Sequence, residues 1–130
     1  MTLLRMLLLV ALGAVLPATT AAADDNSYGA VGVDPHNASV VFITEKASRN
    51  QAMDAVQALC QEHNMTCEVT KPFHDGCASL ARSTDGSTYG LGFEATPASS
   101  QTTALDECTK EGGTGCNIHD TYCSPANLGE

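Results

Sequence analysis

Between residues 28 and 123, short apolar runs and longer stretches with one apolar face follow each other in a fixed order. Residues 28–33 and 39–44 are rich in β-forming residues and flank a polar turn, which predicts two antiparallel strands. Apolar side chains then recur every three or four positions as far as His63, which predicts a helix. Residues 66–73 form a closing strand, so the predicted order is strand, strand, helix, strand.

The same order follows a second time. Residues 77–82 and 88–95 are the next predicted strands, a helix begins after Thr96 and extends to about Lys110, and residues 116–122 form the closing strand. We therefore expect an α+β domain made of two ββαβ repeats. In this interpretation the strands form one largely antiparallel sheet, and both helices lie on the same face of it.

The cysteines mark the same repeat. Cys60, Cys67 and Cys77 recur as Cys108, Cys116 and Cys123, at offsets of 48, 49 and 46 residues. We therefore divide one domain, residues 28–130, into copy one (residues 28–76) and copy two (residues 77–123). A cysteine that ends a helix can reach a cysteine early in the next strand, and the two remaining cysteines each follow a closing strand. The predicted bonds are Cys60–Cys67, Cys108–Cys116 and Cys77–Cys123.

Residues 1–23 have the pattern of an export signal. Arg5 precedes the apolar run Met6–Leu16, and the small residues Ala21–Ala23 suit a signal peptidase. We expect cleavage before Asp24, a flexible acidic segment over residues 24–27, and a location in the periplasm or outside the cell, where disulfides persist. No apolar run reaches the roughly 18 residues of a membrane span, so we expect no stable membrane insertion.

The charge balance restricts the class of partner. The chain has 15 Asp and Glu against 6 Lys and Arg, a net charge of −9, and removal of Arg5 with the signal leaves −10. Nucleic acids and anionic lipids require a basic patch, so the composition excludes them as general partners. We expect a protein partner with a basic surface, which the acidic charge would attract. The sequence leaves the oligomeric state open.

Two histidine–aspartate pairs are the most specific polar feature. His74-Asp75 and His119-Asp120 each stand just before a cysteine, near the end of a predicted closing strand. Two imidazoles beside carboxylates suit cation binding or acid–base catalysis. The same residues also suit turn-prone strand ends, where neighbouring side chains point to opposite faces. We favour this second interpretation and keep the first as the alternative.

The spacing of the cysteines argues against other chemistry. If all six are paired, no thiolate remains as a nucleophile. Structural zinc sites show closely spaced pairs of cysteine or histidine ligands, and the chain has no such pair of cysteines. We therefore predict no metal, no cofactor and no catalytic residue.

Several short motifs resemble a known family. Tyr28-Gly29-Ala30, the run Cys77–Ala81, the segment Tyr89–Gly92 and the cysteine spacing are similar to the family called domain of unknown function 4189. The resemblance covers residues 28–123. It implies a small exported bacterial protein with disulfides and a two-copy fold, and it supplies no catalytic residues to transfer.

These observations favour an exported, non-enzymatic binding module that recognises a protein. An inhibitor, an immunity-type protein and a secreted effector are the forms that fit. The alternative is a small periplasmic hydrolase or metal-dependent enzyme that uses His74 and His119.

Overall fold

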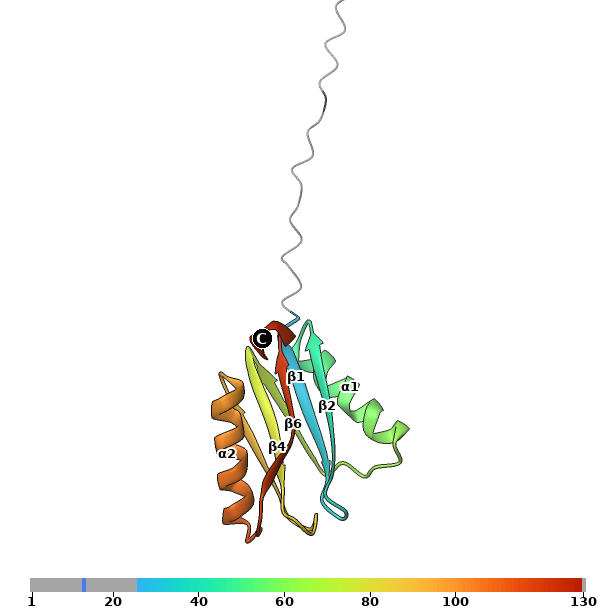
Figure 1. Cartoon of the computed structure of the whole chain (residues 1–130). Helices are drawn as coiled ribbons and strands as arrows, with labels where there is room; N and C mark the ends of the chain where they lie inside the picture. Colours follow the sequence, from blue (N-terminus) through green and yellow to red (C-terminus); the bar gives the residue numbers. More distant parts are fainter. Residues whose placement is uncertain (1–12, 14–25, 130) are drawn as a thin grey trace, which may run out of the picture.

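The computed structural model describes Gly13 and residues 26–129 (Figure 1). The α+β class and the twofold repetition of strand, strand, helix, strand are confirmed. The elements of copy one are β1 (Tyr28–Asp34), β2 (Ser39–Lys46), α1 (Arg49–Glu62) and β3 (Val69–His74). The elements of copy two are β4 (Gly76–Arg82), β5 (Tyr89–Glu94), α2 (Pro97–Lys110) and β6 (Asn117–Ser124), followed by the 3₁₀ turn η1 (Ala126–Gly129).

The strands form two antiparallel sheets of three, which corrects the expectation of a single sheet. Sheet A has the order β2-β1-β3, and sheet B has the order β5-β4-β6. Val31 at the centre of β1 faces Lys71 on β3, and Leu80 at the centre of β4 faces Asp120 on β6. Positions 49 residues apart are therefore structurally equivalent in the central strands of the two copies.

The helices lie on opposite outer faces, so the expectation that they share one face is wrong. Figure 1 shows α2 and α1 at opposite sides of the molecule, with the strands between them. The physical reason is that both faces of each central strand are apolar. In β1, Ala30 is buried beneath α1, whereas Val31 and Val33 pack with Phe73 of the neighbouring strand β3 and with Ala78 of β4 in the other sheet. Each helix covers its own sheet, and the inner faces of the two sheets form the central core.

Local sequence determines where the helices begin. The Ser48 hydroxyl accepts a hydrogen bond from the backbone N–H of Gln51, 3.1 Å away, at the start of α1. At α2, Thr96 caps the helix, Pro97 occupies its first turn, and Ser99 completes a capping box. Hydroxyl side chains suit these positions because they satisfy N–H groups that have no partner inside the helix.

The structure contains the three disulfides that the repeat predicts. Cys60–Cys67 and Cys108–Cys116 each join the last turns of a helix to the segment that leads into the next strand. Cys77–Cys123 joins directly opposed positions on β4 and β6. All six cysteines are thereby paired.

The ordered contacts begin before β1. Ser27, which we expected to belong to a flexible terminus, is 0% exposed, and its carbonyl accepts a hydrogen bond from the N–H of Asp75 at 3.1 Å. The predicted export signal lies outside the described residues apart from Gly13. In the described part of the chain, no helix is long and apolar enough to cross a membrane.

Candidate functional site

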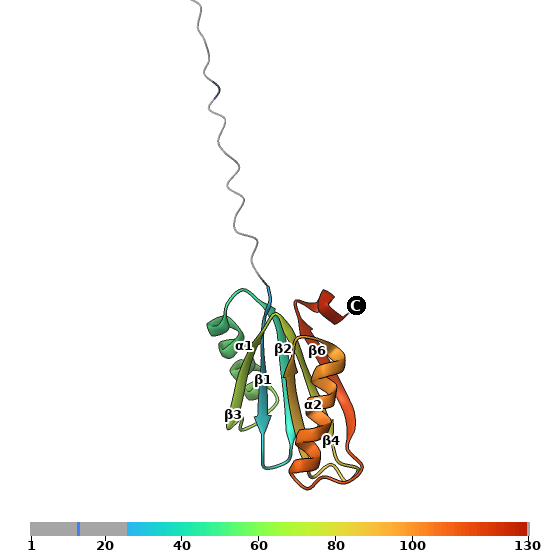
Figure 2. The same ribbon diagram turned by 90° about the vertical axis from the view of Figure 1, so that its left-hand side faces the viewer.

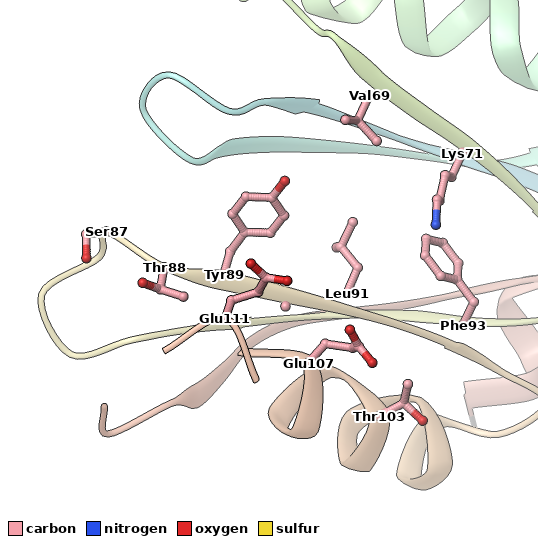
Figure 3. Close-up of a pocket in the computed structure, with 11 residues that line it drawn as sticks. Val69, Lys71, Ser87, Thr88, Tyr89, Leu91, Phe93, Thr103, Glu107 and Glu111 are labelled. Carbon is pink, nitrogen blue, oxygen red and sulfur yellow. The ribbon is translucent and has the colours of Figure 1, made fainter. Parts of the chain in front are cut away.

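A cleft of about 760 Å³ opens at one side of the molecule, where the edge strands β3 and β5 of the two sheets face each other (Figure 3). The cleft extends around β5, so it touches the inner face of that strand and also the flank of α2. Figure 3 shows the side chains of β3 and β5 directed toward one another across the opening. The side chains that line the cleft include Val69, Lys71, Tyr89, Leu91, Phe93, Thr103, Glu107 and Glu111.

Alternating glycines give β5 two different faces. Tyr89, Leu91 and Phe93 point toward sheet A and remain half-buried, because β5 is an edge strand and nothing beyond it completes the core. Gly90 and Gly92 point toward α2, whose backbone lies directly against them. The absence of side chains on this face allows the helix to approach closely. The segment Tyr89–Phe93 therefore supplies the apolar wall of the cleft and also allows α2 to lie close to it.

The electrostatics of the cleft are mostly negative. Glu107 lies in the last turn of α2 and Glu111 is its C-cap, so both carboxylates add to the negative end of the helix dipole. Glu107 is 44% exposed and accepts a hydrogen bond from Lys110 at 3.4 Å. Across the cleft, the Lys71 Nζ lies 5.8 Å from the centre of the Phe93 ring. This arrangement provides an apolar floor with an acidic flank.

The opposite side of the molecule, between β2 and β6, is closed to a greater extent. The rings of Phe42 and Tyr122 lie 4.8 Å apart there. The C-terminal residues also connect the sheets, because the Ser124 hydroxyl accepts a hydrogen bond from the Glu45 N–H at 2.8 Å, and the Ala126 N–H donates to Glu45 Oε1 at 3.4 Å. A smaller cleft of about 410 Å³ remains on this side.

The structure places the two predicted histidines far apart. His74 ends β3, where its ring stacks on Tyr28 with centroids 4.1 Å apart and its Nε2 lies 3.3 Å from Oδ2 of Asp75. His119 and Asp120 lie on β6, which belongs to the other sheet. Figure 2 shows β3 and β6 on opposite sides of the molecule. The geometry therefore does not unite the two histidine–aspartate pairs in one site.

The register also shows why the two pairs differ. Asp120 is equivalent to Lys71, and the equivalent of His74 is Cys123. A bulge on β6 opposite Leu80 and Ala81 shifts the chain next to His119. Within the described residues, no group of three His, Cys, Asp or Glu side chains is placed to hold a metal ion.

Reasoning from the sequence missed the cleft. Glu107 and Glu111 resemble ordinary surface charges in the sequence, and Lys71 gives no signal of its own. The strict alternation of glycine with large apolar residues over residues 89–93 was the available sign, because it requires one face of the strand to touch backbone. That pattern does not say which strand lies at an edge.

Comparison with known proteins identifies a family. Searches of curated proteins and of solved structures give no significant match. One family model, described as a domain of unknown function (DUF4189), matches residues 28–123. The match runs from the first residue of β1 into β6 and includes all six cysteines. Because it covers most of the chain, the protein belongs to the DUF4189 family.

Proposed function

We propose that this protein is an exported binding module that recognises a basic protein through the cleft beside β5. The observation that supports the proposal most strongly is the acidic end of α2 next to an apolar, half-exposed strand. Carboxylates at the C-terminal end of a helix are unfavourable for the helix itself, because they meet its negative pole. Glu111 is thus better placed to attract a cation than to stabilise the fold, and Glu107 adds a second carboxylate beside its ion pair with Lys110.

The overall charge supports the same class of partner. The net charge of −9 becomes −10 without the predicted signal, and a protein with a basic surface would be attracted over a distance of about one Debye length. Inhibitor, immunity-type protein and secreted effector are the biological roles that fit this binding. All three require the same physical event, the capture of a basic protein at an acidic cleft.

A charge-matched pair of variants tests the site. The double variant Glu107→Gln/Glu111→Gln removes two charges at the cleft, and Asp54→Asn/Glu62→Gln removes two from α1 in the other copy. Titration calorimetry against a panel of purified basic exported proteins would compare them. We expect at least one of these proteins to bind the wild type, and to bind it less tightly at high salt. We expect the same protein to bind Glu107→Gln/Glu111→Gln roughly fivefold more weakly than it binds Asp54→Asn/Glu62→Gln. Equal binding by both double variants contradicts the proposal.

Export is the second part of the proposal. Intact mass spectrometry of the protein from its native host should give a chain that begins near Asp24. A mature chain that retains Met1 or Thr2 contradicts it.

The enzymatic alternative has its own discriminating experiment. A hydrolase or metal-dependent enzyme that used His74 and His119 would lose its activity, or its bound metal, in the variant His74→Ala/His119→Ala. The separation of these residues on β3 and β6 favours the binding proposal instead. Unchanged phenotype and unchanged metal content in this variant would dismiss the alternative.

A further inference from the structure

We infer that the partner is bound by strand addition, in which an extended segment of it pairs with the free edge of β5. This inference rests on the proposed function and specifies how the cleft is used. Within the described sheets, β5 pairs with β4 alone, so one row of its backbone groups faces outward. An unpaired edge is a template on which a peptide can form main-chain hydrogen bonds.

The pairing register identifies the outward-facing backbone groups. The Ser83 N–H donates to the Thr88 carbonyl at 2.9 Å, which makes these residues a hydrogen-bonded pair at the mouth of the hairpin. Such pairs alternate along an antiparallel ladder, and the β4–β5 register continues without a shift. Gly90 and Gly92 therefore bond to β4. The residues whose N–H and C=O groups face the free edge are Tyr89, Leu91 and Phe93.

The other three sheet edges carry features that hinder pairing. On β3, Pro72 has no N–H and Lys71 places a charge on the inner face. On β6, a bulge lies opposite Leu80 and Ala81. On β2, the backbone of Glu45 has a φ of 59°, and its N–H is already bonded to the Ser124 hydroxyl. Prolines, bulges and charged side chains are the usual protection of sheet edges, and the segment Tyr89–Phe93 of β5 includes none of them.

The two walls of the cleft determine the kind of segment that fits. A strand added to sheet B would direct alternate side chains toward sheet A and toward α2. On the inner side it would meet the apolar residues Val69 and Leu91, with Lys71 disfavouring a cation. On the α2 side it would meet Glu107 and Glu111. The segment is therefore one in which apolar residues alternate with Lys or Arg.

Charge also distinguishes this occupant from a second copy of the chain. Pairing of β5 with β5 of another molecule would bring Glu107 and Glu111 of both copies to the same edge. Like charges across such an interface are unfavourable. A basic partner strand relieves the negative potential that a second copy would increase.

A backbone-modified peptide provides the sharpest test, because the protein stays unchanged. The probe is a blocked peptide of about seven alternating valines and lysines, long enough to pair along the six residues of β5. The matched control has the same side chains, with N-methyl groups on all its internal amides, so that neither edge of the peptide can donate to β5. We expect the probe to slow hydrogen exchange at the amides of Tyr89, Leu91 and Phe93 by about tenfold or more at saturation. The Gly90 and Gly92 amides, already bonded to β4, should change little.

The outcomes separate this inference from the proposed function. The N-methylated peptide should bind far more weakly, and Glu107→Gln/Glu111→Gln should weaken the probe roughly fivefold. Equal binding of both peptides, or unchanged exchange at the three edge amides, overturns strand addition. If a basic protein still binds in a manner that depends on salt and on Glu107 and Glu111, the proposed function survives. A dimer in light scattering, with these amides protected before peptide is added, would assign the edge to a second copy and overturn the inference.

Discussion

Helix α1 rests on side chains of sheet A, whereas α2 rests on the backbone of sheet B. Val41 and Ile43 of β2 pack beneath α1, and the register puts Gly90 and Gly92 of β5 at the equivalent positions. A Cβ atom added at Gly92 would collide with the carbonyl oxygen of Ser100. The glycines therefore bring α2 closer to its sheet, and with it the carboxylates that line the cleft.

The two copies also differ at their outer edges. The edge at β2 is connected to copy two through Glu45, which bonds to Ser124 and to the N–H of Ala126. At β5, the facing strand β3 contributes Lys71 over the ring of Phe93. A repeat that is closed on one side by its C-terminal segment can leave the equivalent side open for a ligand. The difference teaches that two copies of the same ββαβ unit can have one edge joined to the other copy and the equivalent edge open.

A third difference concerns the cross-strand contact that joins the central strand to the closing strand. In copy two, Cys77 and Cys123 form a disulfide between β4 and β6. In copy one, the equivalent positions on β1 and β3 carry Tyr28 and His74, whose rings stack. The cross-strand contact is a covalent bond in copy two and an aromatic contact of about 1 kcal/mol in copy one.

The largest expected effect on stability comes from the loss of the Cys77–Cys123 disulfide. The variant Cys77→Ala/Cys123→Ala opens a loop with a sequence separation of 46, which corresponds to about 4 kcal/mol of unfolding free energy by loop-closure entropy. The variant Cys60→Ala/Cys67→Ala opens a separation of only 7 and should cost about 2.5 kcal/mol. Urea denaturation of both variants under non-reducing conditions measures the difference. A larger loss for the Cys60–Cys67 pair would show that loop closure does not dominate.

The seating of the two helices predicts the next largest effect. Gly92→Ala adds a methyl group where the α2 backbone leaves no space, so we expect a loss of about 3 kcal/mol from overpacking. At the equivalent position under α1, Ile43→Val removes a methylene and should cost about 1 kcal/mol. Thermal denaturation monitored by circular dichroism compares the variants. Wild-type stability in Gly92→Ala would mean that α2 does not sit on the backbone of β5.

The structural equivalence of the Tyr28–His74 and Cys77–Cys123 positions can be tested by introducing a disulfide at the first pair. Because Tyr28 and His74 face each other on β1 and β3, the variant Tyr28→Cys/His74→Cys should form a fourth disulfide. The new bond closes a loop like that of Cys77–Cys123, and after loss of the ring stack we expect a net gain of about 3 kcal/mol. Thiol titration detects the bond and urea denaturation the gain. Two free thiols after oxidative refolding would refute the equivalence.

Local features of the fold could be predicted from the sequence because they depend on neighbouring residues. The second helix begins after Thr96, as expected, with Thr96 as its cap. The cysteine pairs followed from the repeat and from the short distance between a helix end and the next strand. The number of sheets did not follow, because the adjacent apolar residues Ala30 and Val31 indicate that both faces of the strand are covered without showing what covers them.

The candidate site was harder to predict for a related reason. Its residues come from β3, β5 and α2, and they meet only because β5 is at an edge that faces β3. Edge position depends on the pairing order of the strands, which short motifs do not encode. The two histidine–aspartate pairs were misleading for a different reason. Both stand close to a cysteine in the sequence, which suggests equivalent positions, but the bulge on β6 next to His119 changes the register in copy two.

The turns of the first hairpins repeat a carboxylate in both copies. Asp34 accepts hydrogen bonds from the N–H of Thr66, and from the N–H and ring of His36. Asp85 accepts bonds only from within its own turn, among those described, from Ser83 and Ser87. The bond from Thr66 lowers the pKa of Asp34, and the Ser83 hydroxyl, with further bonds from Ser87, lowers the pKa of Asp85 to about 2. The Asp34 bonds connect its turn to a distant loop, whereas those of Asp85 are local.

The smallest expected effect is the dependence of stability on pH that results from the lowered pKa values of Asp34 and Asp85. Because the folded state holds the Asp85 pKa at about 2 against 3.8 for an unperturbed carboxyl, its contribution to stability is present above pH 4 and is lost as the pH falls toward 2. Asp85→Asn should remove that part of the acid sensitivity, together with the stability that the carboxylate contributes at neutral pH. Asp34→Asn should remove a further part and also lower stability at neutral pH, since it weakens the contact with Thr66. Urea midpoints between about pH 2 and pH 7 measure both, and an acid sensitivity that neither variant reduces would contradict the assignment.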